Sequence, residues 1–124
     1  MGEEPAGAVT PMAPHMAKAQ RHSSGARVSF DLSELREILN LYGRKVAEGE
    51  WRDYAMDFNL ERAVFAVYRR ASENPIYRIE KEPALARKQG AFSVVSAHGL
   101  VLRRGQELKR VLAVLEKKPK LVAW

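Results

Sequence analysis

The alternation of apolar and polar residues between Trp51 and Lys81 predicts three strands in a meander. It breaks at 59–62 and at 72–75, where Asn, Ser and Pro favour turns. Along 54–58 the apolar side chains fall on one face, whereas 63–68 is apolar on both faces. A strand that is apolar on both faces is expected in the centre of a sheet with a helix over one side, so we place 63–68 there, with Phe65 in the core.

A helix is predicted before these strands. Asp31 stands three residues before Glu34, the spacing of a capping box, and Gly49 suits the left-handed position at a helix end. The expected apolar stripe has helical spacing and consists of Leu35, Ile38, Leu39, Tyr42 and Val46. Trp51 follows directly, and we expect it to anchor this helix to the sheet.

The second half of the chain continues the meander and ends in another helix. Strands are expected at 76–80, at 92–95 and at 100–102, the last two joined by a turn at His98 and Gly99, and 82–90 is interpreted as a loop. Gly105 is expected to open the final helix, whose stripe is Leu108, Val111, Leu112 and Leu115. The predicted fold class is therefore α+β, an antiparallel sheet of four to five short strands with an N-terminal and a C-terminal amphipathic helix on the same face.

Length and composition predict one domain. Residues 1–26 are rich in Ala, Gly, Pro and Ser and are interpreted as a disordered tail, 27–118 as the single α+β domain, and 119–124 as a C-terminal tail. About one hundred folding residues suffice for one core but not for two.

Several targeting and membrane functions are not indicated. The chain has no cysteine, so disulfides and thiolate metal sites are excluded, and 1–26 contains no apolar block typical of a signal peptide. The longest apolar run, 63–68, is far shorter than the roughly 20 residues that span a bilayer. We therefore expect a cytoplasmic bacterial protein without membrane association.

Three segments resemble a known family: FDLSELREILNLYGRKVAEGEWRDYAMDF, RAVFAVYRRASENPIYRIEK and LARKQGAFSVVSAHGLVLRRGQELKRVLAVL. They are similar to small alphaproteobacterial proteins catalogued as domain of unknown function 2794. The resemblance covers about Phe30 to Leu115, and the phrases GEWRDYAMDF and YRIEK are its most specific parts. It implies an alphaproteobacterial cytoplasmic protein and brings no catalytic or ligand residues with it.

The sequence offers no catalytic constellation. Asp53 and Asp57 share a strand face, but their Cα atoms would stand ~13 Å apart, too far for a carboxylate pair. Ser96 and His98 lie two apart without an orienting carboxylate. No His or Cys cluster has metal-ligand spacing and no glycine pair forms a phosphate loop. We therefore expect a protein that is not an enzyme and that holds no cofactor and no metal.

The charge is concentrated in one region. The formal net charge is +6, and residues 69–104 contain eight basic and three acidic residues, a net charge of +5. The basic residues are Arg69, Arg70, Arg78, Lys81, Arg87, Lys88, Arg103 and Arg104, and they are interleaved with Tyr68, Tyr77 and Phe92. Basic residues among aromatics are typical of nucleic-acid surfaces, so the hypothesis is non-catalytic binding of nucleic acid or another polyanion on one basic face. The opposing interpretation is a solvated face neutralised by Glu73, Glu80 and Glu82.

A second hypothesis comes from a different class of function. An exposed strand edge, or the C-terminal LVAW that includes Trp124, would suit a protein-interaction or homodimerising adaptor. An acidic protein is then the expected partner of the basic residues, and a homodimer is an open alternative. Salt dependence separates the two hypotheses, because phosphate contacts release counterions.

Overall fold

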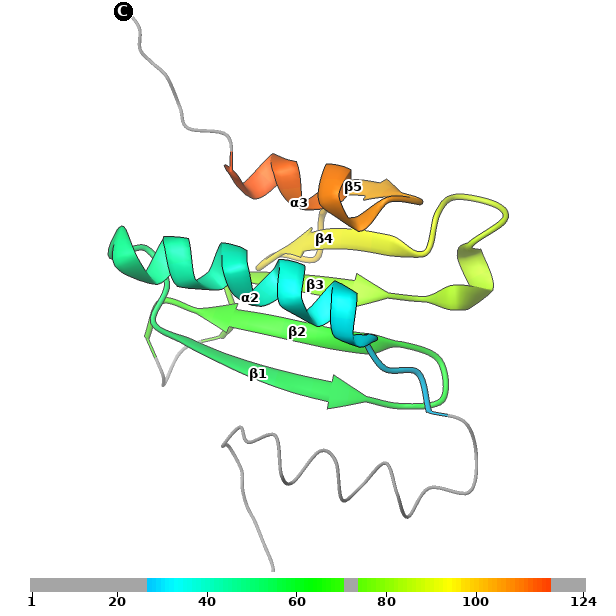
Figure 1. The fold of residues 1–124 in the computed structure, drawn as a ribbon, viewed down its shortest axis with the longest axis horizontal. Helices are drawn as coiled ribbons and strands as arrows, with labels where there is room; N and C mark the ends of the chain where they lie inside the picture. Colours follow the sequence, from blue (N-terminus) through cyan, green and yellow to red (C-terminus); the bar gives the residue numbers. More distant parts are fainter. Residues whose placement is uncertain (1–26, 71–73, 117–124) are drawn as a thin grey trace, which may run out of the picture.

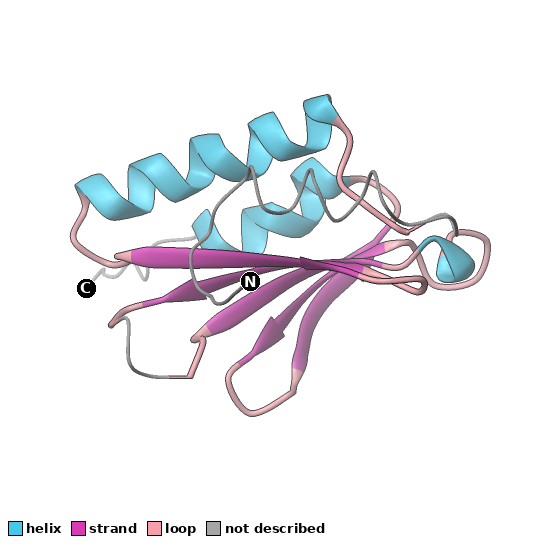
Figure 2. Ribbon diagram, turned by 90° about the horizontal axis from the view of Figure 1, so that it is seen from below, coloured by secondary structure: helices cyan, strands magenta, loops and turns pink. Residues whose placement is uncertain are grey.

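The computed structural model describes residues 27–70 and 74–116. Five antiparallel strands lie in sequence order, β1 to β5, and two helices, α2 and α3, pack on one face of the sheet (Figures 1 and 2). This confirms the α+β class and the placement of both helices on the same face. The predicted tails at 1–26 and 119–124 lie outside the described residues.

Helix α2 spans Leu32–Ala47 and begins where its capping box predicts. The Asp31 side chain accepts a hydrogen bond from the Glu34 backbone N–H at 2.8 Å, and the Glu34 carboxylate accepts one from the Asp31 N–H at 2.9 Å. Gly49, just beyond the helix, has a φ of 80° and so takes the left-handed conformation that the prediction required.

The apolar stripe of α2 is shifted from the predicted one. Ile38 is buried as expected, and Leu35 and Tyr42 pack against the core. Leu41 and Lys45 are also buried, whereas the predicted Leu39 and Val46 are exposed. The helix carries apolar residues on two overlapping faces, and tertiary packing selects between them. The Lys45 stem is buried while its ammonium group lies 3.3 Å from Glu50, so a lysine occupies a position on the buried face.

The meander has the predicted strands with small shifts in their bounds. They are β1 Asp53–Phe58, β2 Ala63–Tyr68, β3 Tyr77–Lys81, β4 Phe92–Ser96 and β5 Val101–Gly105. β2 is interior, with β1 and β3 as neighbours, but the middle position of the sheet belongs to β3. The prediction of β2 as the central strand is therefore wrong by one position, because apolar residues on both faces indicate an interior strand and do not single out the middle one.

The register fixes which residues share a face. Met56, Phe65, Ile79, Val94 and Arg103 are paired in one row across the sheet, on the side of the helices. The next row, on the face away from the helices, consists of Asp57, Val64, Glu80, Ser93 and Arg104. We call this second face the outer face.

The connection between β3 and β4 is mostly loop, as predicted, with one 3-10 turn at Pro83–Leu85. It ends at Gly90, whose φ is 105°. A Cβ at Gly90 would lie 2.3 Å from the carbonyl carbon of Gly105, so the two backbones touch. This contact fixes the loop against the end of β5.

Helix α3 spans Leu108–Glu116, and its four predicted stripe residues are all buried. Gly105 does not open the helix, because it is the last residue of β5. The strand continues three residues further than its apolar part, through two arginines that the pattern did not assign to a strand.

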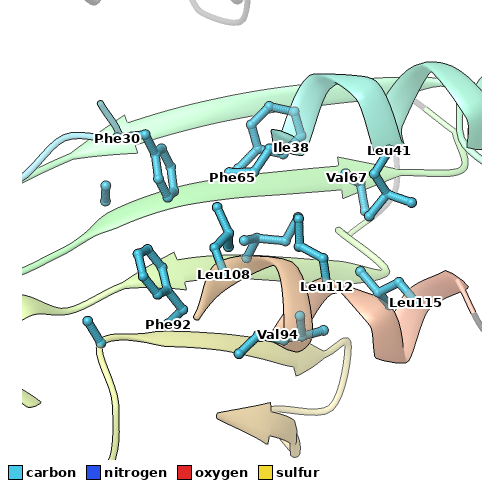
Figure 3. Close-up of a cluster of buried hydrophobic side chains, with 14 of the residues drawn as sticks. Phe30, Ile38, Leu41, Phe65, Val67, Phe92, Val94, Leu108, Leu112 and Leu115 are labelled. Carbon is cyan, nitrogen blue, oxygen red and sulfur yellow. The ribbon is translucent and has the colours of Figure 1, made fainter. Parts of the chain in front are cut away.

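The core lies between the helices and the sheet (Figure 3). Phe65 is fully buried, as predicted, and its ring stacks on that of Tyr54 at a centroid distance of 4.8 Å. Trp51 is 3% exposed, and its ring centroid lies 6.2 Å from that of Tyr42 and 6.3 Å from that of Tyr77. Trp51 therefore joins the end of α2 to the sheet.

Candidate functional site

Among the eight predicted anion-binding residues, Lys81 and Arg78 form ion pairs with glutamates of the domain. The Lys81 ammonium donates to the Glu34 carboxylate at 2.8 Å and to the Ser29 carbonyl oxygen at 2.9 Å. Arg78 lies on the outer face, where its Nε is 3.0 Å from the Glu80 carboxylate. Both side chains are partly buried, and Lys81 joins β3 to the first turn of α2 and to the segment before it.

Glu80 is the centre of a charge network on the outer face. Its side chain is only 8% exposed and contacts Arg78 at 3.0 Å and Arg62 at 3.6 Å. Arg62 also pairs with Glu82 at 3.3 Å. A buried carboxylate is costly unless its charge is compensated, and two guanidinium groups supply that compensation here. The outer face is therefore neutralised at its centre.

The other six basic residues lie at two opposite ends of the sheet. Arg69 and Arg70 follow β2 at the end where β3 begins and β4 finishes, which we call the Arg69 end (Figure 1). Arg87 and Lys88 lie in the loop between β3 and β4, at the other end, which we call the Arg87 end. Strands of five or six residues, ~15 to 20 Å long, separate the two ends.

Arg103 and Arg104 belong to β5 near the Arg87 end, but they point to opposite faces. Arg103 pairs in register with Val94, on the helix side, and Arg104 with Ser93, on the outer face. Arg104 buries its Nη1 atom without a hydrogen-bond partner among the described residues. The sequence-based expectation that the guanidinium groups converge on one face is therefore not met.

The interleaved aromatic residues are divided in the same way. Only Tyr68 belongs to the outer face, opposite Asp53. Tyr77 packs against the core and Phe92 is 8% exposed within it. Stacking of several bases needs several exposed rings, whereas the single aromatic residue that the described chain places on the outer face, Tyr68, is half-buried.

The Arg69 end contains a depression of about 610 Å³. It is lined by Glu50, Trp51, Arg69, Arg70, Ile76, Tyr77, Ser96, Ala97 and His98. His98 is an exposed turn residue, as predicted, and the Ser96 hydroxyl accepts a hydrogen bond from the Leu100 N–H at 3.2 Å. The structure thus brings Arg69, Arg70 and His98 to one depression, although no sequence motif links the histidine to the arginines.

A smaller depression of about 350 Å³ lies between β5 and the start of α3. Arg103, Arg104 and Arg110 contribute to its lining. Glu107 lies there too and pairs with Arg110 at 3.0 Å, which offsets part of the positive charge.

Sequence reasoning missed the most unusual apolar surface. Leu100, Val101 and Leu102 are consecutive and are 65%, 44% and 37% exposed. They lie at and within β5, which has a neighbour on one side only in the part of the chain that the structure describes. The apolar run predicts a strand, but neighbouring residues do not indicate that this strand lies at the edge of the sheet.

The remaining candidates have the placement expected of them. Asp53 and Asp57 are exposed on one face of β1. Burial raises the pKa of the Tyr42 phenol, and the Asp53 carboxylate adds to the effect.

Within 27–70 and 74–116, no three His, Cys, Asp or Glu residues gather in a group that could hold a metal ion. No helix of these segments is long and apolar enough to cross a membrane.

A family model described as "Protein of unknown function (DUF2794)" matches residues 28–112. The chain belongs to this family. The DUF2794 match extends from the segment before α2 into α3, so it includes both the β5 edge and the depression at the Arg69 end. No curated protein and no solved structure matches the chain.

Proposed function

We propose that the protein is a non-catalytic binding module that adds an extended segment of a protein partner to the free edge of β5. The observation that carries this proposal is the exposure of Leu100, Val101 and Leu102 at that edge. An edge strand presents unpaired N–H and C=O groups, and an added strand satisfies them while exposed apolar side chains supply contact area.

The opposite edge of the sheet differs in a way that supports the choice of β5. On β1 the exposed side chains are Asp53 and Asp57, and charged residues on an edge disfavour pairing with another strand. The apolar residues of β1, such as Tyr54 and Met56, pack against the core. The β5 edge instead exposes the apolar side chains of Leu100, Val101 and Leu102.

Charge gives the chemistry of the partner. Arg103 and Arg104 follow the apolar residues on β5, and Lys109 and Arg110 are exposed in the first turn of α3 beside it. A segment that runs antiparallel to β5 would therefore need acidic residues opposite these arginines and apolar residues opposite Leu100 and Val101.

A second copy of the chain fits this edge less well. Antiparallel self-pairing about Leu102 would bring two Arg103–Arg104 pairs into the same short strand pair without acidic residues of β5 between them. In addition, Leu102 is the extra residue of a β-bulge, since Val94 pairs with Arg103 and Val95 with Val101. A bulge acts on any added strand, a second copy and a partner segment alike, so the preference for a partner rests on the arginines.

An extended nucleic acid along the sheet has weaker support. Such a path would meet Arg78 already paired with Glu80, and Lys81 on the opposite face bound to Glu34. Arg103 also faces the helix side. The arginines and lysines therefore do not form one continuous track along a single face.

The test is selection of extended peptides from a displayed random library against the folded protein. We expect selected peptides to combine apolar and acidic residues, and the double variant Leu100→Ser, Val101→Thr to weaken their binding by about tenfold or more, because two apolar contacts are lost. Leu60→Ser is the matched control, since Leu60 is 66% exposed and Leu100 is 65% exposed. Equal losses in both variants would contradict the proposal, as would peptides that bind the double variant unchanged. Sedimentation showing a dimer that Leu100→Ser dissociates would replace the partner by a second copy.

A further inference from the structure

We propose that the depression at the Arg69 end binds a terminal phosphate monoester, carried by a molecule of about mononucleotide size or by the end of a nucleic acid strand. This inference is independent of the β5 edge. It concerns the depression beside the turn that leads into β5, which Leu100, Val101 and Leu102 do not line, and a different ligand chemistry.

The walls of the depression are held by the backbone. The Arg52 N–H donates to the Tyr68 carbonyl oxygen and the Ile76 N–H to the Val67 carbonyl oxygen, both at 2.8 Å. These bonds fix the point where the chain leaves β2 toward Arg69 and the point where it enters β3. On the other side, the Gly99 N–H donates to the Ser96 carbonyl oxygen at 2.9 Å and closes the turn that carries His98.

Trp51 and Tyr77 contribute aromatic side chains to the lining of the depression. Trp51 lines it while remaining 3% exposed, with its ring in contact with those of Tyr42 and Tyr77. Ile76 and Tyr77 are half-buried beside it. A preformed hollow with apolar walls and a few polar groups is the usual form of a small-molecule site, and about 610 Å³ falls within the usual volume range.

The charge of the depression favours an anion. Arg69 and His98 are exposed at it, and Arg69 has no acidic partner among the described residues. Glu50, the acid in the lining, pairs with the Lys45 ammonium at 3.3 Å and so is already compensated.

The donor set suits a phosphate in particular. The exposed guanidinium group of Arg69 offers a planar fork that binds phosphate oxygens in pairs. The Ser96 hydroxyl accepts from Leu100 and thereby keeps its own proton as a further donor. A terminal phosphate exposes more oxygens to such a set than an internal phosphodiester does, and the hollow is larger than a phosphate alone requires. Ile76 and Tyr77 in the lining offer apolar contacts for the body of the ligand.

The experiment is a titration of the isotope-labelled full-length chain, followed by amide chemical shifts, with four probes: adenosine 5′-monophosphate, adenosine, inorganic phosphate and a short oligonucleotide with or without a 5′-phosphate. We expect the monophosphate to shift the amides of Trp51, Tyr77 and His98, and to bind more tightly than either adenosine or inorganic phosphate. If the 5′-phosphorylated oligonucleotide binds more tightly than both the unphosphorylated oligonucleotide and adenosine 5′-monophosphate, the strand end is the source of the phosphate. The reverse order would assign the free nucleotide.

Arg69→Gln is the test variant and Arg87→Gln the matched control, because both arginines are exposed and lie at opposite ends of the sheet. We expect Arg69→Gln to weaken binding of the monophosphate by about tenfold, the loss typical of a charge-assisted phosphate contact, and Arg87→Gln to leave it within twofold. Equal losses in both variants would show attraction by net charge only and would overturn the site. Binding of adenosine as tight as that of its monophosphate, or the absence of shifts at millimolar concentrations of every probe, would do the same.

Discussion

Lys81 and Glu34 are joined by an ion pair of 2.8 Å that links the middle strand of the sheet to the first turn of α2. The Glu34 carboxylate that receives this lysine also accepts the Asp31 backbone N–H, so one side chain caps the helix and anchors it to β3. Both side chains are less than one fifth exposed. The pair converts a residue that the sequence suggested for anion binding into a structural residue.

Removal of the lysine should destabilise the fold. We expect Lys81→Met to lower the free energy of unfolding by roughly 1 to 3 kcal/mol, because it leaves a partly buried carboxylate with fewer partners. Arg87→Met, which changes an exposed residue by the same charge, should stay within about 0.5 kcal/mol. Urea unfolding measures both, and a Lys81→Met protein as stable as the wild type would show that the pair is only a surface contact.

Gly90 should not tolerate a side chain. Gly90→Ala places a methyl group against the Gly105 backbone and also strains a φ of 105°, so we expect a loss of roughly 2 to 6 kcal/mol. Gly99 has a φ of 87° with no atom within 4 Å of the added Cβ, and Gly99→Ala should cost only about 1 to 2 kcal/mol. Similar melting temperatures for the two variants would contradict the close approach of Gly90 and Gly105.

Phe65 should be the most sensitive core position on β2. It is fully buried and packs against Tyr54 and Tyr42, with ring centroids at 4.8 and 6.1 Å. We expect Phe65→Ala to cost roughly 3 to 5 kcal/mol, a large share of the stability of a domain of this size. Thermal denaturation checks this, and an unchanged melting temperature would be incompatible with the sheet order.

Tyr42 should make the fold sensitive to alkaline pH. Burial raises the pKa of its phenol above the ordinary value of 10.0, so above that pH the unfolded chain ionises while the folded chain resists ionisation. The contribution is fully present below pH 10 and is lost as the pH rises through the folded pKa. The wild type should therefore lose more stability than Tyr42→Phe between pH 9 and pH 11 in urea unfolding. Parallel losses in the two proteins would exclude this origin.

Local sequence predicted the elements well, because their signals are local. The capping box of Asp31 and Glu34 fixed where α2 begins, and the stripe of α3 matched its buried face. The buried face of α2 could not be predicted in the same way. Leu39 and Leu41 are equally apolar, and only the position of the sheet decides that Leu41 is buried.

The candidate sites depended on topology, which the sequence pattern does not contain. The pairing of Arg78 with Glu80 is short-range and follows from strand alternation, but that of Lys81 with Glu34 joins residues 47 positions apart. The edge position of β5 follows from the complete strand order, so the exposure of Leu100 could not be inferred from its neighbours. The same holds for His98 and Arg69, which come together because their two turns lie at one end of the sheet.

The most direct measurement for the β5 edge is amide hydrogen exchange with and without a selected peptide. In the free protein, the outward amides of Val101–Gly105 lack a strand partner among the described residues and should exchange rapidly. On binding, protection should appear in this strand, while the amides of the opposite edge, β1, keep their rates. Protection confined to β1 or to the helices, with none in β5, would contradict strand addition as the function of this edge.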